Sequence, residues 1–222
     1  MNLPPNFNRL APVYRWMEYL TFGPGLNRIR CAFLADLRDC RRALVIGDGD
    51  GRFTERLLRA NPTIQIDAVD ASAAMLNSLL RRAGRNATRV QTHLADARQW
   101  QPPAHPYDLI VTHFYLDCLT TEEVQSLANQ LHAAVSPSAL WLVSEFAIPP
   151  NLFGHLVARP LVGALYLAFG WLTGLAVRTL PDHRTALAAS GFTLVQHRAL
   201  LWGLLTGELW SAQPPGSPLA LQ

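Results

Sequence analysis

Two hydrophobic patterns alternate over the middle of the chain. Short apolar runs typical of buried strands recur near residues 43–46, 64–69, 90–94, 107–112 and 139–146. Between most of these runs, apolar positions recur at the spacing of an amphipathic helix. This alternation predicts a parallel α/β sheet with helices packed on it.

Several helices carry start or stop signals. One is expected from about Arg52 to just before Asn61-Pro62, because the residue before a proline avoids the helical region. A second follows the N-cap Ser72 and ends at Gly84. A third follows a capping-box pattern that begins at Thr120.

The end of the chain predicts a helix and a hairpin. Asp182 can cap a short helix that ends at Gly191. The runs 192–201 and 204–210 then pair as two strands.

The first apolar run ends in a glycine-rich turn. Residues 43–53 read ALVIGDGDGRF, with glycines at alternate positions: Gly47, Gly49 and Gly51. A strand, a tight turn and a helix N-terminus commonly hold a nucleotide-like ligand.

The turn favours S-adenosylmethionine (SAM) over a dinucleotide. A dinucleotide fingerprint needs a small residue where this chain has Arg52. Asp48 and Asp50 would repel a pyrophosphate, whereas the sulfonium and ammonium groups of SAM are cationic.

Two further acids follow the next strands. Asp70 ends the second run, where an acid can accept hydrogen bonds from both ribose hydroxyls. Asp96, followed by Ala97, comes after the third run and can accept a hydrogen bond from an adenine amino group. Each acid alone is more often a helix cap or a solvated loop residue. Acids at successive strand ends favour a ligand site.

The segments VIGDGDGRF, IDAVDASAAML, HLADARQW and YDLIVTHFYLDCLT resemble the class I SAM-dependent methyltransferase family. The resemblance covers about residues 41–146 and, more loosely, 181–210. It implies a Rossmann-like, seven-stranded, mostly parallel sheet whose last strand is antiparallel, with helices on both faces. It also implies SAM as cofactor and methyl transfer as activity.

The same resemblance assigns cofactor contacts residue by residue. The methionine part of SAM is expected at residues 47–51, and the ribose at Asp70. Ala71 and Met75 are expected to flank the adenine, with Asp96 and Ala97 at its edge. One position departs from the family: an acid usually stands two residues before the first glycine, where this chain has Val45.

Methyl transfer requires mainly that nucleophile, methyl and sulfur are aligned. A base is needed only when the acceptor carries a proton that it does not lose unaided. His113, directly after the fourth run, is the first candidate, and Asp117 is the second. The alternatives are that His113 contacts the cofactor or caps a loop and that Asp117 braces the next helix. Tyr14, His155 and His183 are weaker candidates.

Two segments stand outside the alternating pattern. Residues 1–40 are rich in aromatics and arginine, and we expect either a helical lid or helices packed on the sheet. Residues 149–180 form an apolar insert, which includes the uncharged stretch 160–177. This stretch just reaches the length of a spanning helix, but its glycines and its place inside the domain argue against a span.

Three interpretations of the insert remain open. It can form buried core helices, an apolar cap over the acceptor, or an interfacial segment that touches a bilayer through residues 152–177. The insert resembles the corresponding region of methyltransferases of quinone and phospholipid biosynthesis.

Composition sets further bounds. The chain has 222 residues, of which 50% are hydrophobic and 16% charged, so an apolar ligand, partner or membrane surface is expected. Residues 1–212 are expected to form one domain, and the Pro-rich residues 213–222 a disordered tail. All 19 basic residues are arginine, which excludes lysine chemistry. Three scattered cysteines form no metal spacing and fit the cytoplasm, with peripheral membrane contact as an option.

The pattern as a whole predicts an enzyme that methylates a small, rather apolar acceptor. The expected acceptor is a quinone-like or phenolic ring, or a lipid head group. A non-catalytic SAM-binding or accessory protein is the alternative. No nucleic-acid partner is expected, because the loop after the fourth run, THFY, lacks the pattern of amino-group methylation on nucleic acids and no RNA-binding module is evident.

Overall fold

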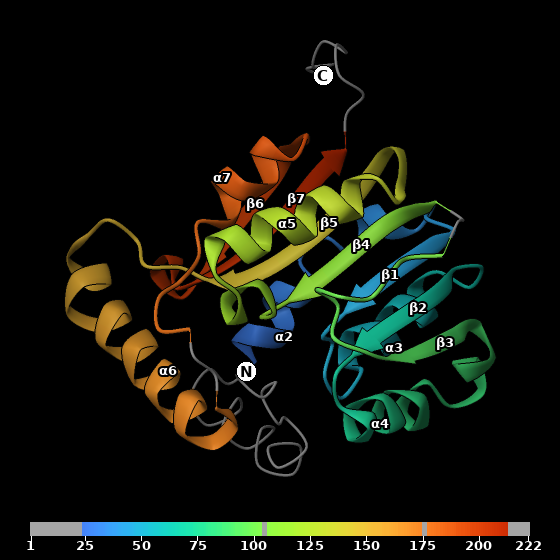
Figure 1. Cartoon of the computed structure of the whole chain (residues 1–222), viewed down its shortest axis with the longest axis horizontal. Helices are drawn as coiled ribbons and strands as arrows, with labels where there is room; N and C mark the ends of the chain where they lie inside the picture. Colours follow the sequence, from blue (N-terminus) through green and yellow to red (C-terminus); the bar gives the residue numbers. More distant parts are fainter. Residues whose placement is uncertain (1–23, 104–105, 175–176, 213–222) are drawn as a thin grey trace.

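The computed structural model describes residues 24–103, 106–174 and 177–212 (Figure 1). These ranges contain a seven-stranded sheet with the order β3-β2-β1-β4-β5-β7-β6. The strands are β1 (Arg42–Ile46), β2 (Gln65–Asp70), β3 (Val90–Leu94), β4 (Tyr107–His113), β5 (Val135–Phe146), β6 (Phe192–Leu200) and β7 (Leu205–Ala212). Strands β1 to β5 pair in parallel, and β7 is antiparallel to both β5 and β6. The expected mostly parallel sheet is therefore confirmed.

The helices that follow Gly51, Ser72, Thr120 and Asp182 begin where the sequence predicts, and the described ranges contain six helices in all. They are α2 (Gly25–Arg30), α3 (Arg52–Ala60), α4 (Ala73–Ala83), α5 (Thr121–His132), α6 (Arg159–Thr173) and α7 (His183–Ala189). Short 3₁₀- or π-helical segments lie at η2 (Leu34–Leu37), η3 (Gly84–Arg89), η4 (Leu116–Cys118), η5 (Gly154–Ala158) and η6 (Leu201–Gly203). The side chains of Ser72, Thr120 and Asp182 each accept a hydrogen bond from a backbone N–H in the first turn of the helix that follows.

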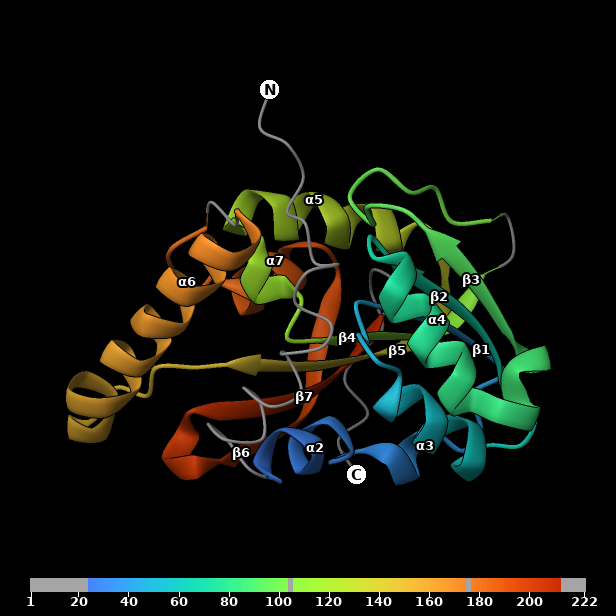
Figure 2. The same ribbon diagram turned by 90° about the horizontal axis from the view of Figure 1, so that it is seen from below.

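The two faces of the sheet carry separate cores because neighbouring strand residues point to opposite faces. Leu44 and Ile46 of β1 pack with residues of α5 and α7 on one face. Ala43 and Val45 pack with residues of α3 and α4 on the other. The helices thus cover both faces (Figure 2), and the carboxyl ends of β1 to β5 lie together along one edge.

Helix α6 stands apart from the layers that cover the sheet (Figures 1 and 2). It is reached from β5 through the π-helical turn η5. One side of this helical segment is buried through Ala158, Val162 and Tyr166, which pack with Leu26 and Leu205. The insert is therefore not a buried core helix. Within the described ranges, no helix is long and apolar enough to cross a membrane.

Part of the N-terminal prediction can be placed. Residues from Gly25 on form α2 and η2, and Phe33 and Leu37 pack in the core beside α3. Residues 1–23 of the expected lid and the expected tail 213–222 lie outside the described residues.

Candidate functional site

Most of the predicted site residues follow the carboxyl ends of adjacent strands. The glycine turn follows β1, Asp70 ends β2, and Asp96 comes two residues after β3. His113 ends β4, and Asp117 lies in η4 directly after it. Because β3, β2, β1 and β4 are successive neighbours in the sheet, these groups share the edge at which open α/β sheets bind ligands.

Glycine is favoured at the three positions of the turn for different physical reasons. All have positive φ, at 68° for Gly47, 60° for Gly49 and 80° for Gly51. A Cβ at Gly47 would lie 2.8 Å from the ring of Tyr115, and one at Gly51 would lie 2.6 Å from the Cα of Leu79. A Cβ at Gly49 would meet nothing within 4 Å. Gly51 is thus explained by close packing against α4, whereas Gly49 leaves the turn open to a ligand.

The two acids of the turn also differ. The Asp48 carboxylate accepts a hydrogen bond from the Thr54 N–H at 2.9 Å, and burial raises the pKa of Asp48 to about 6. Asp50 instead forms ion pairs with Arg52 at 3.1 Å and with Arg82 at 2.8 Å, which tie the turn to α4. Asp48 supplies a partly buried carboxyl group beside the turn, while Val45 is buried in the core.

Asp70 is the acid best suited to a sugar. One carboxylate oxygen accepts the Ser72 N–H at 2.8 Å. Burial, and then the nearby Asp48, raise the pKa of Asp70 to about 6. Ala71 follows it and is exposed, and Met75 is buried in the first turn of α4. This geometry fits the predicted contacts with a ribose and an adenine, which stay predictions.

Asp96 already has a basic partner. Arg98 donates to both carboxylate oxygens of Asp96, at 2.6 to 3.1 Å, and to Glu123 at 2.6 Å. These hydrogen bonds lower the pKa of Asp96. Ala97 is buried in the core beside this group. The adenine contact predicted for Asp96 would have to use a lone pair that Arg98 leaves available.

His113 lies in an enclosed position. Its Nδ1 is 3.0 Å from the hydroxyl of Ser144, and its ring packs edge-on against Phe53 at 4.5 Å. Burial, and then the charge of Arg30, lower the pKa of His113 well below its usual value. Its Nε2 is buried without a hydrogen-bond partner among the described residues. A neutral, enclosed ring suits the cofactor-side interpretation better than that of a base.

Glu145, near the end of β5, holds the loop that carries Asp117. Its carboxylate accepts backbone N–H groups of Tyr115 at 3.2 Å, Leu116 at 2.9 Å and Asp117 at 3.3 Å. Burial raises the pKa of Asp117 to about 6. Burial, and then the neighbouring Asp117, raise the pKa of Glu145 well above its usual value. Two acidic groups therefore share this end of β4 and β5.

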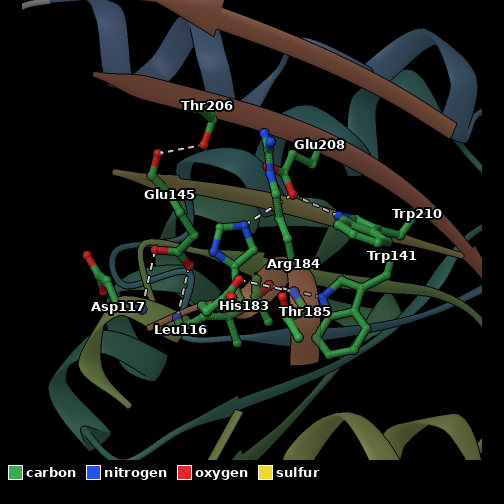
Figure 3. A network of polar contacts seen from close by, with 12 residues as sticks. Leu116, Asp117, Trp141, Glu145, His183, Arg184, Thr185, Thr206, Glu208 and Trp210 are labelled. Atoms are coloured by element: carbon green, nitrogen blue, oxygen red, sulfur yellow. Dashed lines mark hydrogen bonds and ion pairs between the residues drawn. The ribbon is translucent and has the colours of Figure 1, made fainter. Parts of the chain in front are cut away.

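A histidine–carboxylate pair lies beside these acids (Figure 3). His183 Nε2 is 3.1 Å from Glu208, which also accepts hydrogen bonds from Arg184 at 2.7 Å and Trp210 at 2.9 Å. Burial alone would raise the pKa of Glu208, but the hydrogen bond from His183 and the charges of His183 and Arg184 lower it to about 2. The second ring nitrogen of His183 is on the side of Glu145 in this view.

Sequence reasoning did not single out Glu145 and Glu208. Both lie in otherwise apolar strands, within SEF and GELW, and both are 1% exposed. A lone acid inside an apolar strand is a usable signal, because acids are almost never fully buried unless they are paired.

A comparison with known protein families finds a match to one domain family. Residues 43–138 match the family described as methyltransferase domain. This range contains the glycine turn, Asp70, Asp96, His113 and Asp117.

Individual relatives are distant. The chain is 27% identical over 160 residues to a malonyl-[acyl-carrier protein] O-methyltransferase of Paenibacillus sp. strain JDR-2, which covers 69% of this chain and 56% of that protein. The chain thus spans little more than half of that relative's length.

Solved structures share the fold. A putative O-methyltransferase of Nostoc punctiforme PCC 73102 superposes with a TM-score of 0.69 at 18% identity, over 95% of this chain and 62% of that one. The N-methyltransferase NodS of Bradyrhizobium japonicum WM9, in complex with S-adenosyl-L-homocysteine, gives 0.61 at 16% identity, over 84% and 87%.

Proposed function

We propose that the chain is a class I SAM-dependent methyltransferase, which transfers the methyl group of SAM to a small, largely apolar acceptor such as a quinone-like or phenolic ring or a lipid head group. The observation that carries the proposal is the shared sheet edge. It brings a glycine turn with Asp48 and Asp70 next to a second set of titratable groups at the ends of β4 and β5.

The cofactor side fits SAM. Gly49 leaves open space at the turn, and Asp48 and Asp70 hold carboxyl groups that burial penalises when they are charged. A cationic ligand with ribose hydroxyls would stabilise those carboxylates. When bound, SAM supplies an electrophilic methyl group attached to a sulfonium.

The acceptor side combines apolar and titratable groups. The rings of Phe114 and Phe146 pack at 4.9 Å, and both lie against the apolar cluster that includes Tyr166 of α6. The hydroxyl of Tyr166 donates to the backbone carbonyl of Asp117 at 2.7 Å. Helix α6 is thereby joined to the loop after β4, which supports the interpretation of the insert as a cap over the acceptor.

We assign to Asp117 the role of accepting the proton that the methyl acceptor loses. A carboxyl group with a pKa of about 6 is mostly ionised at neutral pH and can accept a proton from a weakly acidic hydroxyl. His183, which contacts Glu208, is close enough to Asp117 for its charge to act on that carboxyl group. With SAM and acceptor bound, the acceptor oxygen would lose its proton to Asp117 as it gains the methyl group, and the electron pair of the broken sulfur–carbon bond would stay on sulfur.

The test is a transfer assay with the purified chain, SAM and a panel of phenols, quinols and lipid head groups, read by mass spectrometry of the methylated product. We expect Asp117→Asn to lower kcat about 100-fold, with the Kd for SAM within twofold of wild type by calorimetry. The rate of the wild type should rise as pH increases through about 6. Asp36→Asn, a substitution outside the proposed site, is the control. Unchanged kcat in Asp117→Asn would contradict the assignment.

The alternative is a protein that binds SAM without turnover. Its support is Val45, which leaves the family's usual acid position without a carboxyl group. Binding of SAM with no product from any acceptor of the panel would favour this alternative. Absence of SAM binding would overturn both.

A further inference from the structure

The outward side of α6 is apolar along its whole length. Pro160, Ala164, Leu167 and Trp171 follow one another at helical spacing and are all exposed, Leu167 by 70% and Trp171 by 88%. A surface helix of a globular protein normally places charged or polar residues on this side. Ala158, Val162 and Tyr166 are buried on the inner side of this helical segment. The segment is therefore apolar on both its inner and its outward side.

A second exposed apolar group adjoins the start of the insert. Leu152 and Leu156 are exposed before α6, and Trp202 is 78% exposed at the tip of the β6–β7 hairpin. The rings of Phe153 and Trp202 are 5.3 Å apart, so the hairpin tip contacts the insert. Both views place the tip and the beginning of α6 at the same end of the molecule.

The backbone presents this tryptophan at a conformational cost. Leu201 and Trp202 have φ values of 50° and 54°, in the left-handed region that bulky residues rarely adopt. Strain of this kind persists where surrounding structure enforces it and often marks a functional segment.

The charged residues around this surface indicate what kind of partner it binds. Residues 147–181 contain no acidic side chain, and Arg159 and Arg178 are exposed before and after the apolar stretch. Exposed tryptophans with flanking arginines suit the boundary between lipid head groups and acyl chains, where the ring meets apolar chains and the cation meets phosphates. At 15 residues, α6 is too short to span a bilayer but long enough to lie on it.

We infer that the outward side of α6, together with Trp202, docks on the surface of an anionic lipid bilayer. This docking surface comprises Leu156, Pro160, Ala164, Leu167, Trp171 and Trp202. The inference does not depend on which acceptor is methylated.

The test is co-sedimentation of the full chain with vesicles of phosphatidylcholine, with and without about one third phosphatidylglycerol. We expect binding to the mixed vesicles that weakens as salt increases. The double variant Leu167→Gln/Trp171→Gln should bind about tenfold less or weaker still. Leu194→Gln/Val195→Gln, which changes two exposed apolar residues of β6, is the matched control and should bind like wild type.

A charge variant tests the electrostatic part. Arg159→Gln/Arg178→Gln should lose the preference for phosphatidylglycerol. Calorimetry with SAM on every preparation separates a folding defect, which lowers SAM affinity, from loss of lipid binding alone.

Two outcomes would overturn the inference. One is that the wild type stays in the supernatant with both vesicle types. The other is that the wild type self-associates without lipid in sedimentation velocity and that Leu167→Gln/Trp171→Gln restores the monomer, which would make this surface a protein interface.

Discussion

Four acidic side chains at the sheet edge have a raised pKa, and burial is the largest cause for each: Asp48, Asp70, Asp117 and Glu145. They form two pairs, one beside the glycine turn and one at the ends of β4 and β5. The first pair suits a cation, because a positive ligand offsets the penalty of burying negative charge. The second suits a proton, because a pKa near neutrality allows a group both to accept and to release one.

At the first pair, Asp70→Asn should weaken SAM binding about tenfold to 100-fold, because one acceptor oxygen is replaced by an NH2 group, which can only donate. The fold should persist, since the substitution removes a buried charge and keeps the shape. Calorimetry gives the Kd, and Asp39→Asn, outside the turn, serves as control. An unchanged Kd would show that the ribose is not bound here.

At the acceptor pair, Glu145→Leu should lower the free energy of unfolding by about 1–3 kcal/mol, because the N–H groups of Tyr115, Leu116 and Asp117 lose their acceptor. Turnover should fall with little change in the Kd for SAM. Glu145→Gln keeps one acceptor oxygen and should recover much of both, which a purely electrostatic role of Glu145 would not allow. Urea denaturation and the transfer assay provide the two readouts.

At the scale of elements, the sequence predicts the strands and helices well because local signals and tertiary packing agree. The capping box at Thr120 and the caps at Ser72 and Asp182 are present as expected. What the sequence could not supply is which groups meet across elements. The contact of Asp117 with Glu145 joins residues 28 apart, and His183 meets Glu208 25 residues away. Such pairings follow from strand order, which was implied only by family resemblance.

The same limit applies to the choice of base. His113 directly follows a strand in the sequence, but its ring turns inward between Ser144 and Phe53. Sequence position gives the strand end and leaves the direction of the side chain open.

The glycine turn offers a test of element packing. Gly51→Ala should destabilise the protein by more than the roughly 1–2 kcal/mol of left-handed strain, because its Cβ would also collide with the backbone of α4. Gly49→Ala meets open space and should show the strain alone, with weaker SAM binding. Urea denaturation of the two variants separates the cost of the left-handed backbone from the cost of the collision with α4. Equal losses of stability would mean that α4 can move away from the turn.

At the scale of the whole molecule, the raised acids govern the dependence of stability on pH. An unfolded aspartate has a pKa of about 3.9, whereas burial raises the pKa of Asp48, Asp70 and Asp117 to about 6 in the folded chain. Between these values the folded chain holds more protons, so its stability should fall as pH rises from about 4 to about 6. The lowered pKa of His113 has the opposite effect, because it makes stability rise with pH. It is one group against the four acids with a raised pKa.

The measurement is the Tm of the cofactor-free protein by calorimetry at a series of pH values, which should decrease by several degrees between about pH 4.5 and 6.5. Glu208, with a pKa of about 2, contributes only at lower pH. A Tm that increases over this interval would show that the acids are paired with cations in solution.

The place of β7 between β5 and β6 has a consequence for synthesis on the ribosome. Strands β1 to β4, with the glycine turn and Asp70, can pair once residue 113 has emerged, whereas one edge of β5 stays uncovered until Leu205–Ala212 arrives between β5 and β6. The nascent chain would therefore first assemble the part that carries the glycine turn and Asp70, and it would keep an open strand edge and the apolar insert until residue 212 has emerged. Asp117 and Glu145 can meet once β5 has emerged, but His183 meets Glu208 only when β7 is present. A stalled chain could therefore be competent to bind SAM before the proposed acceptor side is complete.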